Sequence, residues 1–194
     1  MPVIKYKNLV KKITEKPVFG VNDLFLQDIP RNYAKKILYE LSKSNKITRV
    51  ERGKYTVLDD AITVATQLTE PCYVSMWSAL SIRRLTTQIP FSVEIVTTRK
   101  RFNRRIMFKN TPIIFYTAQP LMMYGYENIV WKEHLRIPVA KPEKIIIDAL
   151  YFRAISPEEL NEVITIANKK LLISFAKLTH NTYVITTVER MISC

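Results

Sequence analysis

The sequence predicts an α+β protein with two domains. Residues 1–58 form a small helical domain closed by a β hairpin, and residues 59–194 form a mixed α/β domain with a small, mostly antiparallel sheet and C-terminal helices. Three observations predict this arrangement: apolar residues recur at helical spacing near the N-terminus, β-rich runs follow between residues 93 and 118, and positive charge is concentrated early in the chain. A chain of 194 residues that is 47% hydrophobic is long enough to bury a core in each domain.

The N-terminal domain is expected to begin with two helices. Apolar residues three or four positions apart predict a first helix over residues 3–15, and this helix ends at Lys16-Pro17 because the residue before a proline avoids the helical region. Its apolar face consists of Tyr6, Leu9, Val10 and Ile13. Asn22 is the expected N-cap of a short second helix that runs through Leu26.

A third helix and a hairpin complete this domain. Pro30 suits the first turn of a helix, where its missing N–H costs nothing. The apolar face of that helix consists of Ala34, Ile37, Leu38 and Leu41. Residues 47–50 and 54–57 read as two short strands, and Gly53 suits the tight turn between them. Three helices followed by a hairpin are the order of a winged helix-turn-helix, whose third helix enters the major groove of DNA.

The polar residues on the outer face of this domain are the candidate DNA contacts. They are Arg31, Asn32, Lys35, Lys36, Tyr39 and Lys43 on the third helix, and Arg49, Arg52 and Lys54 on the hairpin. Arg31, Asn32 and Lys35 are expected nearest to base edges, because Arg and Lys match guanine and Asn matches adenine. Phosphates or the minor groove are the expected contacts of Lys36, Lys43, Arg49, Arg52 and Lys54. The alternative is that the domain binds a protein or RNA and that its lysines only solvate a small helical domain.

Charge supports a polyanionic partner. The net charge is +13, and residues 1–57 contain 13 Lys and Arg against 5 Asp and Glu, so this stretch alone carries +8. Cationic side chains that neutralise phosphates release condensed counterions, which favours binding to nucleic acid. No run of about 20 apolar residues predicts a membrane span, and no apolar stretch follows the N-terminus, so we expect a cytoplasmic protein with no membrane partner.

The second domain alternates helices and strands. Asp59 or Asp60 caps a helix that stops before Pro71, residues 72–74 form a strand, and Ser75 caps the next helix. Further strands are expected at residues 93–98, 105–108, 113–118 and 135–139. Pro142 begins a helix. Ser156-Pro157-Glu158-Glu159 is a capping box that opens a helix running to about Leu171, and one or two more helices follow.

A second basic run lies between two predicted strands of this domain. It consists of Arg99, Lys100, Arg101, Arg104 and Arg105, with Lys109 beyond, and no acidic residue interrupts it. The run has two interpretations. It is a second nucleic-acid contact or a surface for an RNA or protein partner, or else it is a solvated hairpin loop. The sequence alone leaves both interpretations open.

Catalytic and metal-binding patterns are not found. The sequence has no HExxH, GxSxG or P-loop motif, and Glu94, Glu143 and Asp148 lack the spacing of a metal-dependent nuclease. Asp148 lies in an apolar helix and is expected to be a hydrogen-bonded structural carboxylate. Cys72 and Cys194 lie too far apart to predict a zinc ligand pair, so Cys72 is expected to be buried and Cys194 free. We therefore expect no enzyme, no metal and no cofactor.

Two blocks in the second domain resemble a known family. The first is Tyr73-Val74-Ser75-Met76-Trp77-Ser78-Ala79-Leu80, which precedes Gln88-Ile89-Pro90, and the second is Ala140-Lys141-Pro142-Glu143-Lys144-Ile145-Ile146-Ile147-Asp148. Placed in this order behind a basic winged helix, they resemble the AbiEi family, the antitoxin and transcriptional regulator of type IV toxin–antitoxin systems. The resemblance covers roughly residues 5–170.

The resemblance implies a sequence-specific autorepressor. Its implied partners are double-stranded DNA, through inverted repeats in its own promoter, and a nucleotidyltransferase-like toxin that it counteracts without a stable complex. The helix around residues 31–36 and the wing around residues 49–54 would read DNA. The two blocks would be structural, with Ser75 as a cap, Leu80 and residues 145–147 in the core, and Glu143 and Lys144 in a first helical turn. The alternatives are a protein or RNA interaction module without operator binding, and a nuclease with unrecognised active-site residues.

Overall fold

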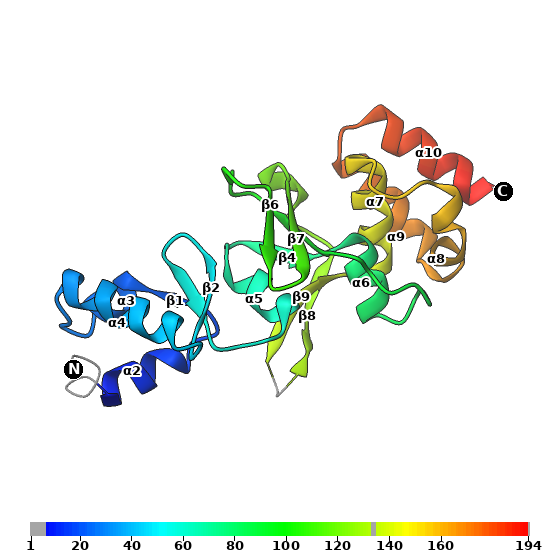
Figure 1. Cartoon of the computed structure of the whole chain (residues 1–194). Coiled ribbons are helices and arrows are strands. Elements are labelled where there is room, and N and C mark those ends of the chain that lie inside the picture. The colour runs from blue at the N-terminus through cyan, green and yellow to red at the C-terminus, as the bar shows by residue number, and fades with distance from the viewer. Residues whose placement is uncertain (1–6, 133–134, 194) are drawn as a thin grey trace. The chain divides into compact units, whose positions relative to one another are not determined.

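The computed structural model describes residues 7–132 and 135–193 (Figure 1). The chain divides into two compact units, Met1–Leu68 and Thr69–Cys194, against an expected boundary at residue 58. Each unit is described by itself. Within the described residues, none of the helices combines the length and the apolar character that crossing a membrane requires.

The N-terminal unit packs helices against a small antiparallel sheet. Its helices are α2 (Lys7–Thr14), α3 (Val21–Phe25), α4 (Arg31–Lys43) and α5 (Ala61–Gln67). Its strands are β1 (Phe19–Gly20), β2 (Thr48–Glu51) and β3 (Lys54–Thr56), in the order β1–β3–β2. Ile13, Leu24, Ile37 and Ile47 are buried together, so α2, α3, α4 and the start of the hairpin share one core.

The helices follow the sequence prediction closely but not at every end. Helix α4 begins immediately after Pro30 and buries its four predicted apolar residues. The expected N-cap at Asn22 is wrong, because Asn22 lies inside α3. Gly20 stands at the cap position, and its N–H donates to the Asp23 carboxylate at 2.8 Å. Residues 3–6 of the first predicted helix, Tyr6 among them, lie outside the described residues.

Strand β1 is an addition that the sequence did not predict. It pairs with β3 through Phe19↔Tyr55 and Gly20↔Lys54. A Cβ atom at Gly20 would lie 2.3 Å from the carbonyl oxygen of Gly53, so only glycine allows the two backbones to come this close. Gly53 has a φ of +78°, which the hairpin turn requires.

The C-terminal unit is built on a six-stranded mixed sheet (Figure 1). Its strands are β4 (Cys72–Val74), β5 (Val93–Thr97), β6 (Arg105–Phe108), β7 (Thr111–Thr117), β8 (Tyr126–Val130) and β9 (Arg136–Ala140). The order is β6–β7–β5–β4–β9–β8. The pairs β5–β7 and β4–β9 are parallel and the other pairs are antiparallel. The sheet is therefore mostly antiparallel, as expected, but it is larger than the small sheet that we expected and includes the unpredicted strand β8.

Helices gather on one face of this sheet around α7 (Figure 1). They are α6 (Met76–Ile82), α7 (Pro142–Phe152), α8 (Asn161–Ile166), α9 (Lys169–Leu178) and α10 (Thr182–Ser193), with the short 3₁₀ turns η1 (Pro120–Met122) and η3 (Glu158–Leu160). Ile145, Ile146 and Ile147 are fully buried, because α7 is covered by other elements on all sides.

The long helix expected from Ser156 to Leu171 is wrong. It is a 3₁₀ turn followed by two helices, because Ala167 takes an extended conformation and Asn168 starts a new helix by accepting a hydrogen bond from the Leu171 N–H at 3.1 Å. The capping box at Ser156 is present in part: Glu159 accepts from the Ser156 N–H at 3.1 Å.

Candidate nucleic-acid interface

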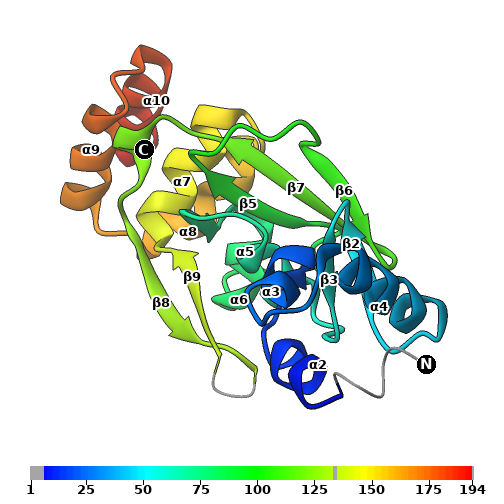
Figure 2. The same cartoon turned by 90° about the vertical axis from the view of Figure 1, so that its left-hand side faces the viewer.

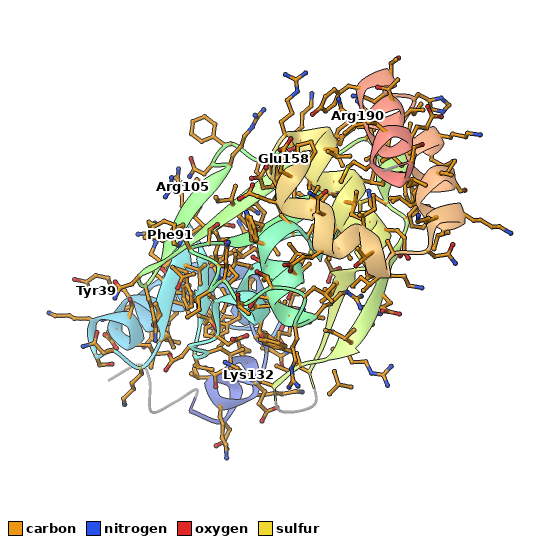
Figure 3. The ribbon with its side chains drawn as sticks, turned by 90° about the vertical axis from the view of Figure 1, so that its right-hand side faces the viewer. Tyr39, Phe91, Arg105, Lys132, Glu158 and Arg190 are labelled. Carbon is orange, nitrogen blue, oxygen red and sulfur yellow. The ribbon has the colours of Figure 1, made fainter. Side chains whose placement is uncertain are left out.

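Helix α4 presents one polar face. All six residues predicted on it are exposed, and the four apolar residues on its other side are buried. At about 100° per residue, the six positions cover an arc of roughly 140°. The arc contains no acidic residue, since Glu40 lies beyond its edge. Tyr39, in the middle of the arc, points outward from the helix (Figure 3).

The beginning of α4 is unusually cationic for a helix. Its first turn contains no acidic residue and starts with Arg31, although the partial positive charge of a helix N-terminus favours anions there. The Arg31 guanidinium lies 5.1 Å from the centre of the Phe25 ring, so α3 holds it beside this end of α4. A phosphate bound here would compensate both the arginine and the helix dipole.

The β2–β3 hairpin adds cations in the same unit, and Figure 2 shows it with α3 and α4. Arg49 and Arg52 are exposed, Arg52 at the turn itself. Lys54 differs from them, because its ammonium lies 3.2 Å from the Glu51 carboxylate and donates to the carbonyl of Leu68 at 2.5 Å. Lys54 would have to leave both partners to take the predicted phosphate contact.

The second basic run separates into two groups. Arg99 and Arg101 are held by the fold: the Arg99 Nε donates to the carbonyl of Glu70 at 3.0 Å, and the Arg101 guanidinium lies 4.0 Å from the centre of the Phe115 ring. Lys100, Arg104 and Arg105 are exposed. Figure 3 shows Arg105 on the outer strand β6. The sequence prediction overlooked Phe102 in this run, whose side chain is fully exposed.

The two blocks that resemble the AbiEi family meet inside the C-terminal unit in a buried polar cluster. Its members are Tyr73, Ser75, Tyr124, Lys144 and Asp148. The Asp148 carboxylate accepts from Lys144 Nζ at 2.6 Å, from Ser75 Oγ at 2.8 Å and from the Tyr73 hydroxyl at 3.3 Å. The side chains of Lys144 and Asp148 are both completely buried. Asp148 is thus the hydrogen-bonded structural carboxylate that we expected.

The environment of this cluster suits structure rather than chemistry. Burial raises the pKa of Asp148, while the ammonium of Lys144 and the hydroxyls of Ser75 and Tyr73 oppose that shift. Burial, followed by the charge of Asp148, also raises the pKa of Tyr73. The Lys144 ammonium lies 4.4 Å from the centre of the Tyr124 ring and is screened from solvent by it. A charge pair so enclosed can hold β4, α6 and α7 together but offers a substrate no approach.

Ser75 is not the cap that we expected. It occupies the N-cap position of α6, but its hydroxyl is bound to Asp148 and makes no capping hydrogen bond. Glu94 of the neighbouring strand β5 takes that role: its carboxylate accepts from the Ser78 N–H at 3.1 Å, and its own N–H donates to Ser78 Oγ at 3.0 Å. Burial raises the pKa of Glu94, and the hydrogen bonds from Ser78 oppose the shift.

Glu143, in the first turn of α7 as expected, also has a structural partner. Its carboxylate accepts from the N–H of Asn168 at 2.7 Å and so fixes the start of α9. Leu80 is buried as expected. Glu143 therefore joins α7 to the start of α9, and Asp148 joins α7 to β4 and to the start of α6.

Two grooves in the described part of the C-terminal unit are small. One of about 240 Å³ lies between Trp77, Leu85 and Val163, with Glu158 and Glu162 at its rim, and a neighbouring one is about 300 Å³. Both lie at or below the lower limit of typical ligand pockets, which is roughly 300 Å³. In the part of the chain that the structure describes, no three His, Cys, Asp or Glu residues cluster in a way that could hold a metal ion.

The cysteines contribute no reactive site to the described residues. Cys72 is buried in β4, and burial together with the charge of Glu70 raises its pKa to about 12. A thiol with so high a pKa is a poor nucleophile at neutral pH. Cys194 lies outside the described residues.

Neither the models of protein families nor the curated proteins give a match to this chain. The resemblance to the AbiEi family therefore rests on the two sequence blocks.

Proposed function

We propose that this chain is a sequence-specific DNA-binding transcriptional regulator that represses its own promoter. In this proposal the N-terminal unit acts as a winged helix-turn-helix, with α4 in the major groove and the β2–β3 hairpin as the wing. Arg31, Asn32 and Lys35 contact base edges, and the other exposed cations of α4 and the hairpin contact phosphates.

One observation carries the proposal: the polar face of α4 is continuous and free of acidic residues. The first turn of α4 has an arginine and no acidic residue, and both features oppose the helix dipole. Solvation of a lysine-rich helix does not require either feature. An anionic partner turns the same arrangement into a favourable one. The short segment between α3 and α4 supports the proposal, because it leaves α3 packed against α4 as in a helix-turn-helix.

We further propose that the regulator is the antitoxin of a type IV toxin–antitoxin pair. The support is the resemblance of the two blocks to the AbiEi family, and the fact that their polar residues meet in one cluster rather than on the surface. Co-expression with a nucleotidyltransferase-like toxin encoded beside this gene tests the idea. Restored growth of cells that produce the toxin is expected, and continued growth arrest at equal toxin levels would reject the antitoxin role.

The DNA proposal is tested with the duplex that lies upstream of the gene. We expect Arg31→Ala and Asn32→Ala each to weaken binding to this duplex by about 1 to 3 kcal/mol and to leave binding to random DNA nearly unchanged. Lys12→Ala is the matched control, because Lys12 is an exposed lysine on α2 rather than on the α4 face. Fluorescence anisotropy across a salt series measures the DNA affinities of the wild type and the three variants. Unchanged operator binding by Arg31→Ala would exclude α4 as the reading helix.

A protein-binding module is the second candidate, and one observation favours it. Phe25 and Leu26, at the end of α3, are exposed apolar residues, and Leu26 is 74% exposed. Such residues are typical of interaction surfaces when they occur side by side. Binding to nucleic acid that is independent of both sequence and salt would favour this candidate over an operator-binding regulator.

A further inference from the structure

The loop between β5 and β6 exposes an aromatic ring that the fold does not use. The side chain of Phe102 is fully exposed, at 103% relative accessibility. Burying a phenylalanine side chain stabilises a protein, and a ring left in water does not contribute that stabilisation. A partner that covers the ring would supply the missing contact.

The loop is anchored on both sides of this ring. The Arg99 N–H donates to Thr97 Oγ1 at 3.2 Å, and Thr97 Oγ1 donates to the carbonyl of Pro71 at 2.7 Å. On the other side, the Phe115 N–H donates to the carbonyl of Arg104 at 2.7 Å. The Arg101 guanidinium stacks over the Phe115 ring immediately before Phe102. These contacts fix the ends of the loop that exposes Phe102, so part of the ordering cost of binding is already met.

The charged residues that flank Phe102 in the sequence are all cations. From Thr98 to Lys109 every charged residue is Lys or Arg. Lys100, Arg104 and Arg105 are exposed and make no ion pair within the described residues. Strand β6 lies at the edge of the sheet and alternates, with Ile106 and Phe108 facing inward and Arg105 facing outward. Three of the cations that flank Phe102 in the sequence, Lys100, Arg104 and Arg105, therefore have no anionic partner within the described residues.

An aromatic ring between unpaired cations matches the chemistry of single-stranded nucleic acid. An unpaired base offers a face for stacking, and its neighbouring phosphates lie within reach of flanking arginines. The bases of an intact duplex are already stacked on one another, so they cannot use such a ring without being unstacked. An anionic membrane surface would favour a longer apolar face than one ring at a loop tip.

We propose that the loop Thr98–Arg105 binds single-stranded nucleic acid, with an unpaired base stacked on Phe102 and the flanking phosphates held by Lys100, Arg104 and Arg105. This site is separate from the duplex-binding face of the proposed function and does not depend on it. One guanidinium group can donate two parallel hydrogen bonds to the oxygens of one phosphate, so Arg104 and Arg105, which follow the ring, are suited to phosphate contacts.

The test uses the full chain and labelled 12-nucleotide strands of DNA and of RNA with no self-complementarity. Phe102→Ala is expected to weaken binding by about 5- to 150-fold, the equivalent of 1 to 3 kcal/mol for one stacked base, and Phe102→Trp to retain it. Arg104→Gln with Arg105→Gln is expected to weaken binding and make its salt dependence shallower. The DNA and RNA strands decide which polymer is preferred.

Ile89→Ala is the matched control, because Ile89 is 93% exposed in another loop of the same unit. Equal affinities of wild type and Phe102→Ala for both strands would overturn the proposal. Binding of anionic lipid vesicles that depends on Phe102, without such dependence for either strand, would also overturn it. A background of Arg31→Ala, Lys35→Ala and Arg52→Ala separates the two sites: it removes duplex binding if the proposed function holds, and it leaves the effect of Phe102→Ala on single strands unchanged.

Discussion

The ammonium of Lys144 in the C-terminal unit is completely buried, and removing such a charge from water is energetically costly. It is compensated by one carboxylate, that of Asp148, and by the faces of Tyr124 and Tyr73. Removing one member of a buried charge pair leaves the other charge without compensation in a low-dielectric interior, which costs more than the pair contributes. Stability should therefore depend on whether both charges are present or both absent.

We expect Lys144→Met to lower the free energy of unfolding by about 3 to 5 kcal/mol. The double variant Lys144→Met with Asp148→Asn should be more stable than Lys144→Met alone, because the amide oxygen still accepts from Ser75 and no charge remains buried. Urea denaturation of the wild type, both single variants and the double variant gives the coupling free energy. Additive effects of the two changes would show that the pair is not coupled.

Glu94 should make stability depend on pH. Its pKa in the folded state is raised above the ordinary value of 4.5, so the folded protein holds the proton more tightly than the unfolded chain does. The stability that this proton provides is present below the unfolded pKa and is lost as the pH rises through the folded pKa.

In Glu94→Gln the side chain stays neutral at every pH, and its oxygen can still accept from the Ser78 N–H. The variant should therefore gain stability relative to the wild type as the pH rises from about 4 to about 8. Denaturation midpoints of both proteins across this range measure the effect. Two parallel pH profiles would contradict it.

At the scale of elements, the turn from β4 into α6 contains a strained residue. Met76, the first residue of α6, has a φ of +49° and is completely buried. A non-glycine residue in this region carries a backbone cost that the surrounding packing must outweigh. Here Ser75 is fixed by Asp148 and Ser78 by Glu94, so Met76 is held from both sides.

We expect Met76→Gly to be more stable than Met76→Ala by about 0.5 to 1 kcal/mol, because both remove the same side chain and only glycine relieves the positive φ. Ala79→Gly in the same helix is the control, and there glycine should be the less stable residue by about 1 kcal/mol. Thermal unfolding ranks the four proteins. If the glycine variant is less stable than the alanine variant at position 76, as it is expected to be at position 79, the backbone at Met76 is not strained.

Elements with strong internal periodicity could be predicted from the sequence, and those made by distant contacts could not. The apolar faces of α4 and α7 repeat at helical spacing, and both helices were located within a residue or two. Strands β1 and β8 have short or irregular patterns and exist because β3 and β9 pair with them. The break between α8 and α9 likewise depends on Asn168 and its contact with Glu143, 25 residues away.

The candidate site divides in the same way. Exposure of the α4 residues follows from helical spacing alone, so all six were predicted. Lys54 pairs with Glu51 within the hairpin itself, but its hydrogen bond to the carbonyl of Leu68 depends on where the segment after the hairpin returns, and periodicity does not specify that. Phe102 was missed because an aromatic residue beside a strand is ordinarily assigned to the core. The signal available for its exposure was the absence of any acidic residue from Thr98 to Lys109.

At the scale of the whole molecule, electrostatics should dominate the proposed binding of duplex DNA. Six cations of the α4 face and hairpin carry no ion pair within the described residues: Arg31, Lys35, Lys36, Lys43, Arg49 and Arg52. Each phosphate neutralised contributes about −0.9 to the slope of log affinity against log salt concentration.

We expect a slope of about −4 for the operator duplex if Lys36, Lys43, Arg49 and Arg52 are the phosphate contacts, and a slope no steeper than about −5 if Arg31 and Lys35 also neutralise phosphates. Arg52→Ala should make the slope shallower by about one, whereas Lys54→Ala should change it less, because its ammonium is already paired with Glu51. Affinities at four or more salt concentrations give the slopes. A larger effect of Lys54→Ala than of Arg52→Ala would show that Lys54 leaves its partners on binding.

The close approach of Gly20 to Gly53 has a consequence for recognising relatives. Any side chain at position 20 would collide with the main chain of the turn, whereas open space surrounds position 53 and only its dihedral angle favours glycine. Asparagine tolerates that angle, so the glycine at position 53 can be replaced, whereas the glycine at position 20 cannot. A distant homologue that retains this hairpin should therefore keep glycine just before its second helix, even where the surface residues that contact a ligand have diverged beyond recognition.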